Sequence, residues 1–84
     1  MKPTHIATTL SRPAEVTAWQ FNHTLPIPVW VARKFHRVDD TGWHGIARDG
    51  SIVKAEPSNW AVVVEGKDII VLTHEEFTSN FRPI

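Results

Sequence analysis

Short strand-like runs separated by turn-forming residues fill most of the second half of the chain. They occupy residues 42–48, 51–56, 60–65 and 69–72. Runs of this length, rich in β-branched and aromatic residues and bounded by Gly, Pro or Asp, are typical of β-strands. Asp49-Gly50 is the strongest hairpin signal, because two-residue type I′ turns need positive φ at both central residues and favour this pair. Gly66-Lys67-Asp68 predicts a second hairpin, so the pattern predicts an antiparallel meander.

A capped helix is predicted directly after the meander. Thr73 and Glu76 have the spacing of a capping box, in which the threonine hydroxyl and the glutamate carboxylate each accept a backbone N–H of the other residue. Phe77 and Phe81 are one helical turn apart, so we expect both rings on the face that packs against the sheet. Pro83 is expected to end this element.

The first half of the chain has weaker signals. Residues 14–21 alternate with a period of two and predict a strand with Trp19 and Phe21 on one face. Residues 28–36 predict a two-turn helix, because proline suits a first helical turn and an Ala-Arg-Lys run favours helix. Val29-Trp30-Val31 also fits a strand, which is the rival interpretation. Residues 38–42 predict a turn.

These elements predict a single small α+β domain over residues 13–84, preceded by a flexible lead or edge strand over residues 1–12. We expect an antiparallel sheet of about four or five strands, with one or two short helices on one face. Four Trp and four Phe supply a large share of the core for such a short chain. The residues assigned to that core are Trp19, Val62, Val64 and Phe77.

Composition narrows the function classes. Nine basic and nine acidic side chains give a formal net charge of zero, which disfavours nucleic-acid binding and binding to anionic membranes. Zero net charge also removes long-range repulsion and permits a homodimer. The chain has no cysteine, and a small domain without disulfides is more typical of the cytoplasm. No run approaches the ~20 apolar residues of a membrane span, and the first residues lack a signal-peptide pattern.

No motif predicts catalysis, a cofactor or a bound metal. The five histidines have neither the i, i+2 spacing of a strand site nor the i, i+4 spacing of a helical zinc site. A site built from His36, His44 and Asp39 or Asp40 is geometrically conceivable, but ordinary surface histidines are the better interpretation. Ser51 and Ser58 lie in turn-forming sequence without a nucleophile motif. The chain also has no glycine-rich phosphate loop, so we expect a protein that is not an enzyme.

The residues assigned to partner binding surround the one basic cluster of the chain. They are Trp30, Arg33, Lys34, Arg37 and Trp43. Trp and Arg are enriched at binding hot spots, so an exposed Trp30 or Trp43 would mark an interface, whereas a small core that needs large rings is the alternative. Acidic residues 39–40 follow the cluster directly and suit a protein partner better than a phosphate backbone.

The order of these elements resembles a family of small phage and prophage proteins of unassigned function. In that family the step into the apolar strand typically reads Pro-Gly-Asp-Trp, and here it is Pro57-Ser58-Asn59-Trp60. The proline and the tryptophan are kept, whereas the middle pair differs. The resemblance covers roughly residues 13–82 and also rests on the strand end Trp19-Gln20-Phe21, on Val62-Val63-Val64, Gly66 and Val71-Leu72, and on Glu76-Phe77.

The resemblance implies a phage or prophage origin without implying an activity. Phage genomes encode many short proteins that bind and block host machinery, including inhibitors of CRISPR systems. We therefore expect a non-enzymatic accessory protein that acts in the host cytoplasm by binding a host or phage protein. Two alternatives stay open: a nucleic-acid-associated factor that uses residues 30–37, and a virion or assembly component that works as a homo-oligomer.

Overall fold

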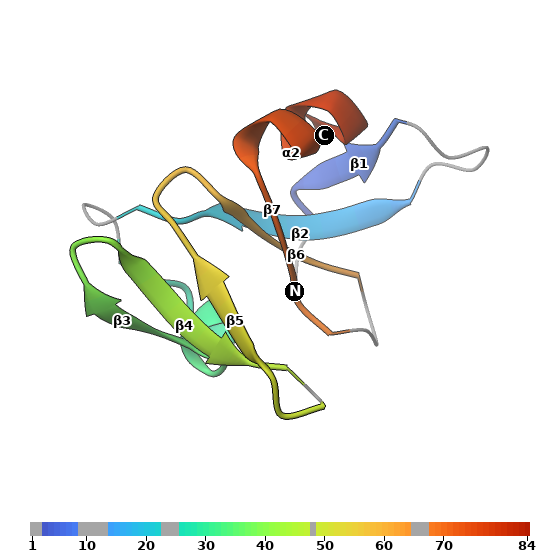
Figure 1. Ribbon diagram of the computed structural model, residues 1–84. Coiled ribbons are helices and arrows are strands. Elements are labelled where there is room, and N and C mark those ends of the chain that lie inside the picture. The colour runs from blue at the N-terminus through green and yellow to red at the C-terminus, as the bar shows by residue number, and fades with distance from the viewer. Residues whose placement is uncertain (1–2, 9–13, 23–25, 48, 65–67) are drawn as a thin grey trace.

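Two antiparallel sheets and two short helices make up the computed structural model, which describes residues 3–8, 14–22, 26–47, 49–64 and 68–84 (Figure 1). In chain order the elements are β1 (His5–Ala7), β2 (Glu15–Gln20), α1 (Val29–Ala32), β3 (Phe35–Asp39), β4 (Gly42–Ile46), β5 (Ile52–Ala55), β6 (Trp60–Val63), β7 (Ile70–Leu72), α2 (His74–Asn80) and β8 (Phe81–Pro83). None of the helices in these ranges is long and apolar enough to span a membrane.

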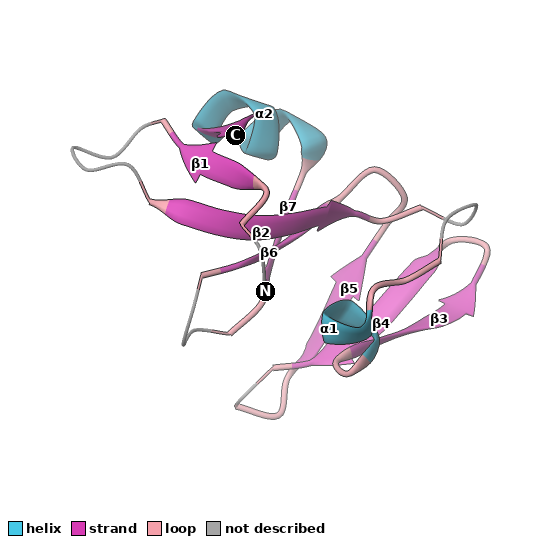
Figure 2. Cartoon of the chain, turned by 180° about the vertical axis from the view of Figure 1, so that it is seen from behind, coloured by secondary structure: helices cyan, strands magenta, loops and turns pink. Residues whose placement is uncertain are grey.

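The two sheets are built differently. One has five strands in the order β7-β6-β2-β1-β8, and the other has three in the order β3-β4-β5. The five-stranded sheet lies between α2 on one face and the three-stranded sheet with α1 on the other (Figures 1 and 2). The broad expectation of an antiparallel α+β domain is confirmed. The expectation of a single sheet of four or five strands is wrong, because eight described strands form two sheets.

Period-two alternation explains how one sheet serves two cores. In β2, Val16 belongs to the cluster beneath α2, whereas Trp19 packs with the cluster beneath the three-stranded sheet. The neighbouring β6 residues Ala61 and Val62 are 0% and 1% exposed and point to opposite faces. A strand buried on both faces needs apolar residues at consecutive positions, and the run at 60–63 supplies them.

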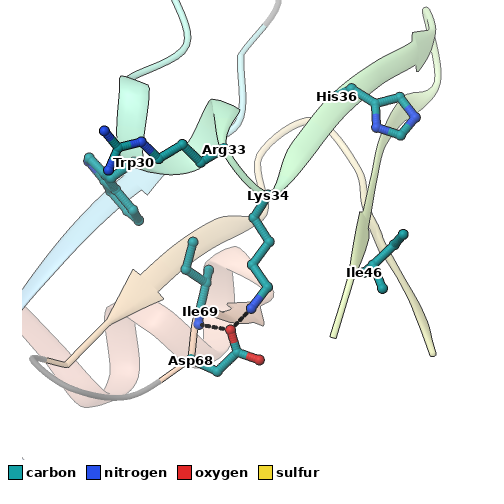
Figure 3. Close-up of a pocket in the computed structure, with 7 residues that line it drawn as sticks. All are labelled: Trp30, Arg33, Lys34, His36, Ile46, Asp68 and Ile69. Atoms are coloured by element: carbon teal, nitrogen blue, oxygen red, sulfur yellow. Dashed lines mark hydrogen bonds and ion pairs between the residues drawn. The ribbon is translucent and has the colours of Figure 1, made fainter. Parts of the chain in front are cut away.

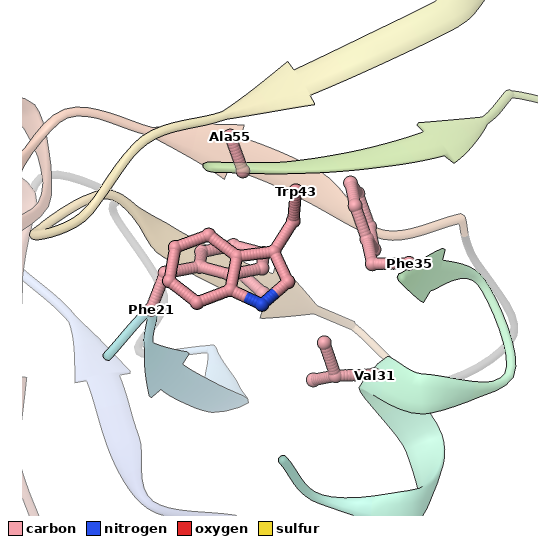
Figure 4. Packing of buried hydrophobic residues seen from close by; sticks show 6 residues of the cluster. Phe21, Val31, Phe35, Trp43 and Ala55 are labelled. Carbon is pink, nitrogen blue, oxygen red and sulfur yellow. The ribbon is translucent and has the colours of Figure 1, made fainter. Parts of the chain in front are cut away.

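The larger core cluster joins the two sheets through aromatic rings (Figure 4). The ring centroid of Phe21 lies 4.9 Å from that of Trp43 and 5.4 Å from that of Phe35, distances at which aromatic pairs attract one another. Val31 from α1 is fully buried beside them, and Ala55 closes the cluster from β5. This cluster holds α1 and the three-stranded sheet against the five-stranded sheet.

The second cluster lies beneath α2 and confirms the predicted cap. The Thr73 hydroxyl accepts the Glu76 backbone N–H at 3.1 Å, and the Glu76 carboxylate accepts the Thr73 N–H at 3.0 Å. Phe77 is 2% exposed, and its ring stacks on Trp60 at 4.0 Å between centroids. The helix ends at Asn80. The prediction that Phe81 belongs to the helix is therefore wrong. Phe81 begins β8 and still stacks on Phe77, at 5.0 Å.

The predicted helix at 28–36 is much shorter in the structure. Only Val29–Ala32 is helical, and a two-residue turn leads into β3 at Phe35. The rival strand interpretation of 29–31 is therefore wrong, but residues 35–39 are a strand that the sequence analysis assigned to helix and turn. Pairing with β4 outweighs the local helix preference, because it brings Phe35 into the core while satisfying the backbone groups of the segment.

The predicted strand at 14–21 is confirmed as β2, and the expectation for residues 1–12 is corrected. The strand β1 lies between β2 and β8, paired with both, so it is not an edge strand. Residues 1–2 and 9–12 lie outside the described ranges. Val64 is 37% exposed, so its assignment to the core is wrong.

The predicted antiparallel strand pairing of both hairpins is confirmed. The β4–β5 hairpin has a different loop from the one expected, because Gly50 has a φ of 87° whereas Asp49 does not have positive φ. The carbonyl of Ala47 accepts the Gly50 N–H at 2.9 Å, and Gly50 takes the left-handed conformation after that turn. The strands β6 and β7 pair antiparallel as predicted, and residues 65–67 of their connection, which include Gly66 and Lys67 of the predicted turn, lie outside the described ranges.

The connection from β5 in one sheet to β6 in the other is a tight turn from Glu56 to Asn59. The Asn59 N–H donates to the Glu56 carbonyl at 3.0 Å, with Pro57 second and Ser58 third at a φ of 80°. Proline followed by a residue of positive φ has the signature of a type II turn. The Asn59 side chain also accepts the Glu56 N–H at 2.9 Å, which fixes the entry into β6.

Candidate partner-binding site

The segment from α1 to β3 carries four of the five residues assigned to partner binding. The Pro28 carbonyl accepts the N–H groups of Val31 and Ala32 at 3.0 and 2.8 Å, which starts a single helical turn. The fully buried Val31 anchors that turn in the core. Anchoring one side leaves Arg33 exposed and Trp30 half-buried on the rim of the core.

An open pocket of about 520 Å³ adjoins this turn (Figure 3). It gathers three of the five predicted residues, Trp30, Arg33 and Lys34. The remaining lining residues are His36, Ile46, Asp68 and Ile69. The pocket therefore combines aliphatic surface with an indole and a guanidinium, two of the side-chain types most enriched at binding hot spots.

An ion pair crosses the base of the pocket. The Lys34 ammonium contacts the Asp68 carboxylate, and the two side chains are only 25% and 27% exposed. The same carboxylate oxygen accepts the Ile69 backbone N–H at 3.0 Å. This pair links the α1–β3 turn to the start of β7, and it compensates the charge of Lys34 within the protein.

Arg33 differs from the other basic residues of the segment. Within the described residues its guanidinium makes no ion pair, and it is one helical turn from Trp30, which lines the same pocket. The Trp30 indole N–H likewise has no hydrogen-bond partner in the described part of the chain. Arg33 and Trp30 therefore offer hydrogen-bond donors to a partner, and the exposed His36 lines the same pocket.

Arg37 and Trp43 do not join this pocket. They face each other across β3 and β4 and line a second pocket of about 390 Å³. The Arg37 guanidinium bonds to the Asp40 carboxylate at 2.5 Å. Trp43 is 3% exposed, so the prediction of Trp43 as an exposed contact residue is wrong. Its register opposite Ala55 directs the ring into the core.

Four lining residues of the first pocket were missed by the sequence analysis. Asp68 and Ile69 come from a distant part of the chain, and nothing in the local pattern connects them with Lys34. His36 and Ile46 lie on paired strands whose register was not known. For Ile46, the predicted β4–β5 hairpin was a signal in the sequence, because it places this residue near the end of a strand.

The acidic residues near this segment are engaged locally. Asp39 accepts hydrogen bonds from the backbone N–H of Thr41, at 2.7 Å, and from its hydroxyl. These bonds stabilise the carboxylate and lower the pKa of Asp39 below its usual range. Among the described residues, no group of three or more His, Asp or Glu side chains is placed to hold a metal ion.

Comparison with known proteins found no relative of this chain. No protein-family model matches the chain, and no match was found among curated proteins or among solved structures.

Proposed function

We propose that this protein is a non-enzymatic accessory protein of phage or prophage origin that binds a host or phage protein through the pocket beside α1. The observation that carries the proposal is the pairing of Arg33, free of any ion pair in the described part of the chain, with the half-buried Trp30. Arginine and tryptophan are the residue types most enriched at interface hot spots, and here both line one open pocket. Inhibition of a host defence such as a CRISPR system is the form of this function that the size and the family resemblance favour.

The distribution of charge supports a protein partner over a nucleic acid. Lys34 is compensated by Asp68, and Arg37 by Asp40. A nucleic-acid surface gains affinity by neutralising several phosphates, and these ion pairs leave few cations for that purpose. The segment 30–37 therefore offers a mixed, partly apolar surface.

The turn before β6 supports the family resemblance. Ser58 has a φ of 80°, and glycine, which the family has at this position, adopts that conformation at less cost. Asn59 accepts the Glu56 N–H through its side-chain oxygen, and the aspartate of the family motif has an oxygen in the same place. The Pro-Gly-Asp-Trp motif thus suits the backbone that the Pro-Ser-Asn-Trp sequence adopts here.

The proposal is tested by capture from a bacterial lysate with tagged wild-type protein and three variants. Arg33→Glu and Trp30→Ala change the pocket, whereas Arg82→Glu makes the same charge change on β8, an edge strand of the five-stranded sheet. We expect one set of bound proteins to be recovered with wild type and Arg82→Glu and lost with the two pocket variants. Equal recovery with all four proteins would show that the pocket is not the site.

Two further measurements separate the alternatives. In a host with an active CRISPR system, expression of the wild type should restore plating of a targeted phage, and expression of Arg33→Glu should not. Binding to generic single-stranded and duplex DNA should be absent at low salt. Tight binding to DNA that weakens steeply with added salt would favour the nucleic-acid alternative instead.

A further inference from the structure

The outward face of the three-stranded sheet carries two ordered rows of side chains. The pairing register places His36 opposite His44 and His44 opposite Lys54, which gives one row across β3, β4 and β5. Two residues further along the strands, Ile46 is opposite Ile52. Neighbouring strands are ~4.8 Å apart, and residues i and i+2 of one strand are ~7 Å apart. A polar row and an aliphatic row therefore run side by side.

This face points away from the core. The alternate residues Phe35, Trp43 and Ala55 are 2–3% exposed and pack inward, and α1 lies on their side of the sheet (Figure 2). By contrast, Ile46 and Ile52 are 62% and 66% exposed. Ile46 and Ile52 lie side by side next to polar residues and form a small apolar spot that a partner can cover.

We propose that this outer face binds an extended, acidic segment of the protein partner, an inference that rests on the proposed function and names the chemistry of the partner. Successive side chains on one face of an extended chain are separated by the same ~7 Å as the two rows. A segment with a carboxylate at position i and an aliphatic residue at i+2 therefore matches the polar row with one side chain and the aliphatic row with the next.

Charge complementarity decides between an acidic and a basic occupant. Lys54 provides an exposed ammonium with no ion pair in the described residues, and both imidazoles of the row can donate an N–H to a carboxylate. Asp39 and Glu56 lie beyond the polar row, at the end away from the isoleucines. Asp39 and Glu56 would repel acidic side chains of the segment that extend past the polar row. The further acidic residues of the segment should therefore lie on the side of the isoleucines.

The face is continuous with the pocket described above. His36 and Ile46 belong both to the two rows and to the pocket lining (Figure 3). A segment that crosses the polar row and then the aliphatic row continues toward the pocket that Arg33 lines, where a further carboxylate can meet the guanidinium. A second copy of this chain fits less well. If two such faces packed with aligned strands, the Lys54 ammonium groups of the two copies would lie close together and repel each other.

The test begins with selection of a displayed random-peptide library on the immobilised wild-type protein at neutral pH. We expect enriched sequences with Asp or Glu followed two positions later by Ile, Val or Leu. Failure to enrich any sequence, or enrichment of Lys- and Arg-rich sequences, would overturn the proposal. The most enriched peptide, labelled with a fluorophore, is then used to titrate the variants.

Three surface variants report where the peptide binds. We expect Lys54→Glu and Ile52→Asp each to weaken binding more than about tenfold, because each places a carboxylate against the acidic segment. Arg82→Glu should leave the affinity unchanged. Unchanged affinity for Lys54→Glu, with its melting curve intact, would overturn the proposal even if Ile52→Asp fails to fold.

Capture from lysate separates this inference from the proposed function. If Trp30→Ala abolishes capture of the partner while Lys54→Glu and Ile52→Asp retain it, the pocket is the site and the outer face is not. If all three variants capture the partner as well as wild type does, both proposals fail.

Discussion

The five-stranded sheet is covered on both faces, whereas the three-stranded sheet is covered on one. In β6 the consecutive residues Ala61 and Val62 are both buried, each in a different cluster. In β5 the buried Ala55 follows the exposed Lys54. The two sheets therefore have different sequence patterns, a continuous apolar run and an alternating one.

This difference separates stability from binding along the chain. Every face of the five-stranded sheet that packs against α2 or against the second sheet contributes to the core. On the outer face of the three-stranded sheet, Ile46 and Ile52 are 62% and 66% exposed, so folding does not explain these two isoleucines. A substitution should therefore have a large effect on stability wherever a face is covered and a small one on the outer face.

The largest loss of stability is expected for Trp43→Ala, on the inner face of the three-stranded sheet. Its ring packs against Phe21 and is almost fully buried, so truncation should lower the free energy of unfolding by about 3–5 kcal/mol. Urea denaturation measures this loss, with Trp30→Ala as the matched control. A larger loss for the half-buried Trp30 than for Trp43 would contradict the placement of both rings.

A smaller loss is expected for Val62→Ala in the sheet covered on both faces. Val62 is 1% exposed and contacts the cluster beneath α2, so removal of two methyl groups should cost about 2 kcal/mol. Val64→Ala, two positions further on at a side chain that is 37% exposed, is the control. Equal shifts in the urea midpoint of both variants would show that β6 is not buried as described.

The cap of α2 stabilises the helix that covers one face of the five-stranded sheet. Thr73→Ala removes the hydroxyl that accepts the Glu76 N–H and should cost about 0.5–2 kcal/mol in urea denaturation. Coincident midpoints for variant and parent would show that the cap does not hold this helix.

The same cap predicts a dependence of stability on pH. Hydrogen bonds from Thr73 lower the pKa of Glu76 below its ordinary value of 4.5. Its stabilising effect is therefore complete above 4.5 and is lost as the pH falls through the lowered folded-state pKa. Stability measured down this range should fall less steeply for Glu76→Gln than for the parent. Parallel curves would contradict this contribution.

The turn that joins the two sheets offers a small gain in stability. Ser58 has a φ of 80° at the third position of a type II turn, so Ser58→Gly should raise the free energy of unfolding by about 0.5–1 kcal/mol. Ser58→Ala is the control, since alanine has the same steric conflict as serine. Stabilisation by alanine as well as by glycine would mean that backbone strain is not the cause.

The smallest effect is expected on the outer face. Ile52 is 66% exposed, so Ile52→Thr, which keeps a β-branched side chain in the strand, should change stability by less than about 0.5 kcal/mol. Thermal melting of parent and variant checks this. A loss comparable with that of Val62→Ala would show that the outer face is covered, for example by a second copy of the chain.

The sequence was most informative where the determining interactions are local. The capping box of Thr73 and Glu76, the β4–β5 hairpin and the strand β2 could be predicted, because each depends on residues close together in the chain. The sequence also indicated Arg33 and Trp30 as residues in excess of what the fold requires. In the structure these two residues line one pocket.

The remaining features depend on contacts between distant residues, which local patterns do not encode. Tertiary pairing converted residues 35–39 from the predicted helix and turn into β3, placed β1 inside a sheet and buried Trp43. It also brought Asp68 to Lys34 and aligned His36, His44 and Lys54 in one row. The sequence by itself determined the pairing of β4 with β5, the cap of α2 and which residues are apolar. Only the tertiary structure decided which faces are covered, because burial depends on how the strands of two sheets are paired and packed.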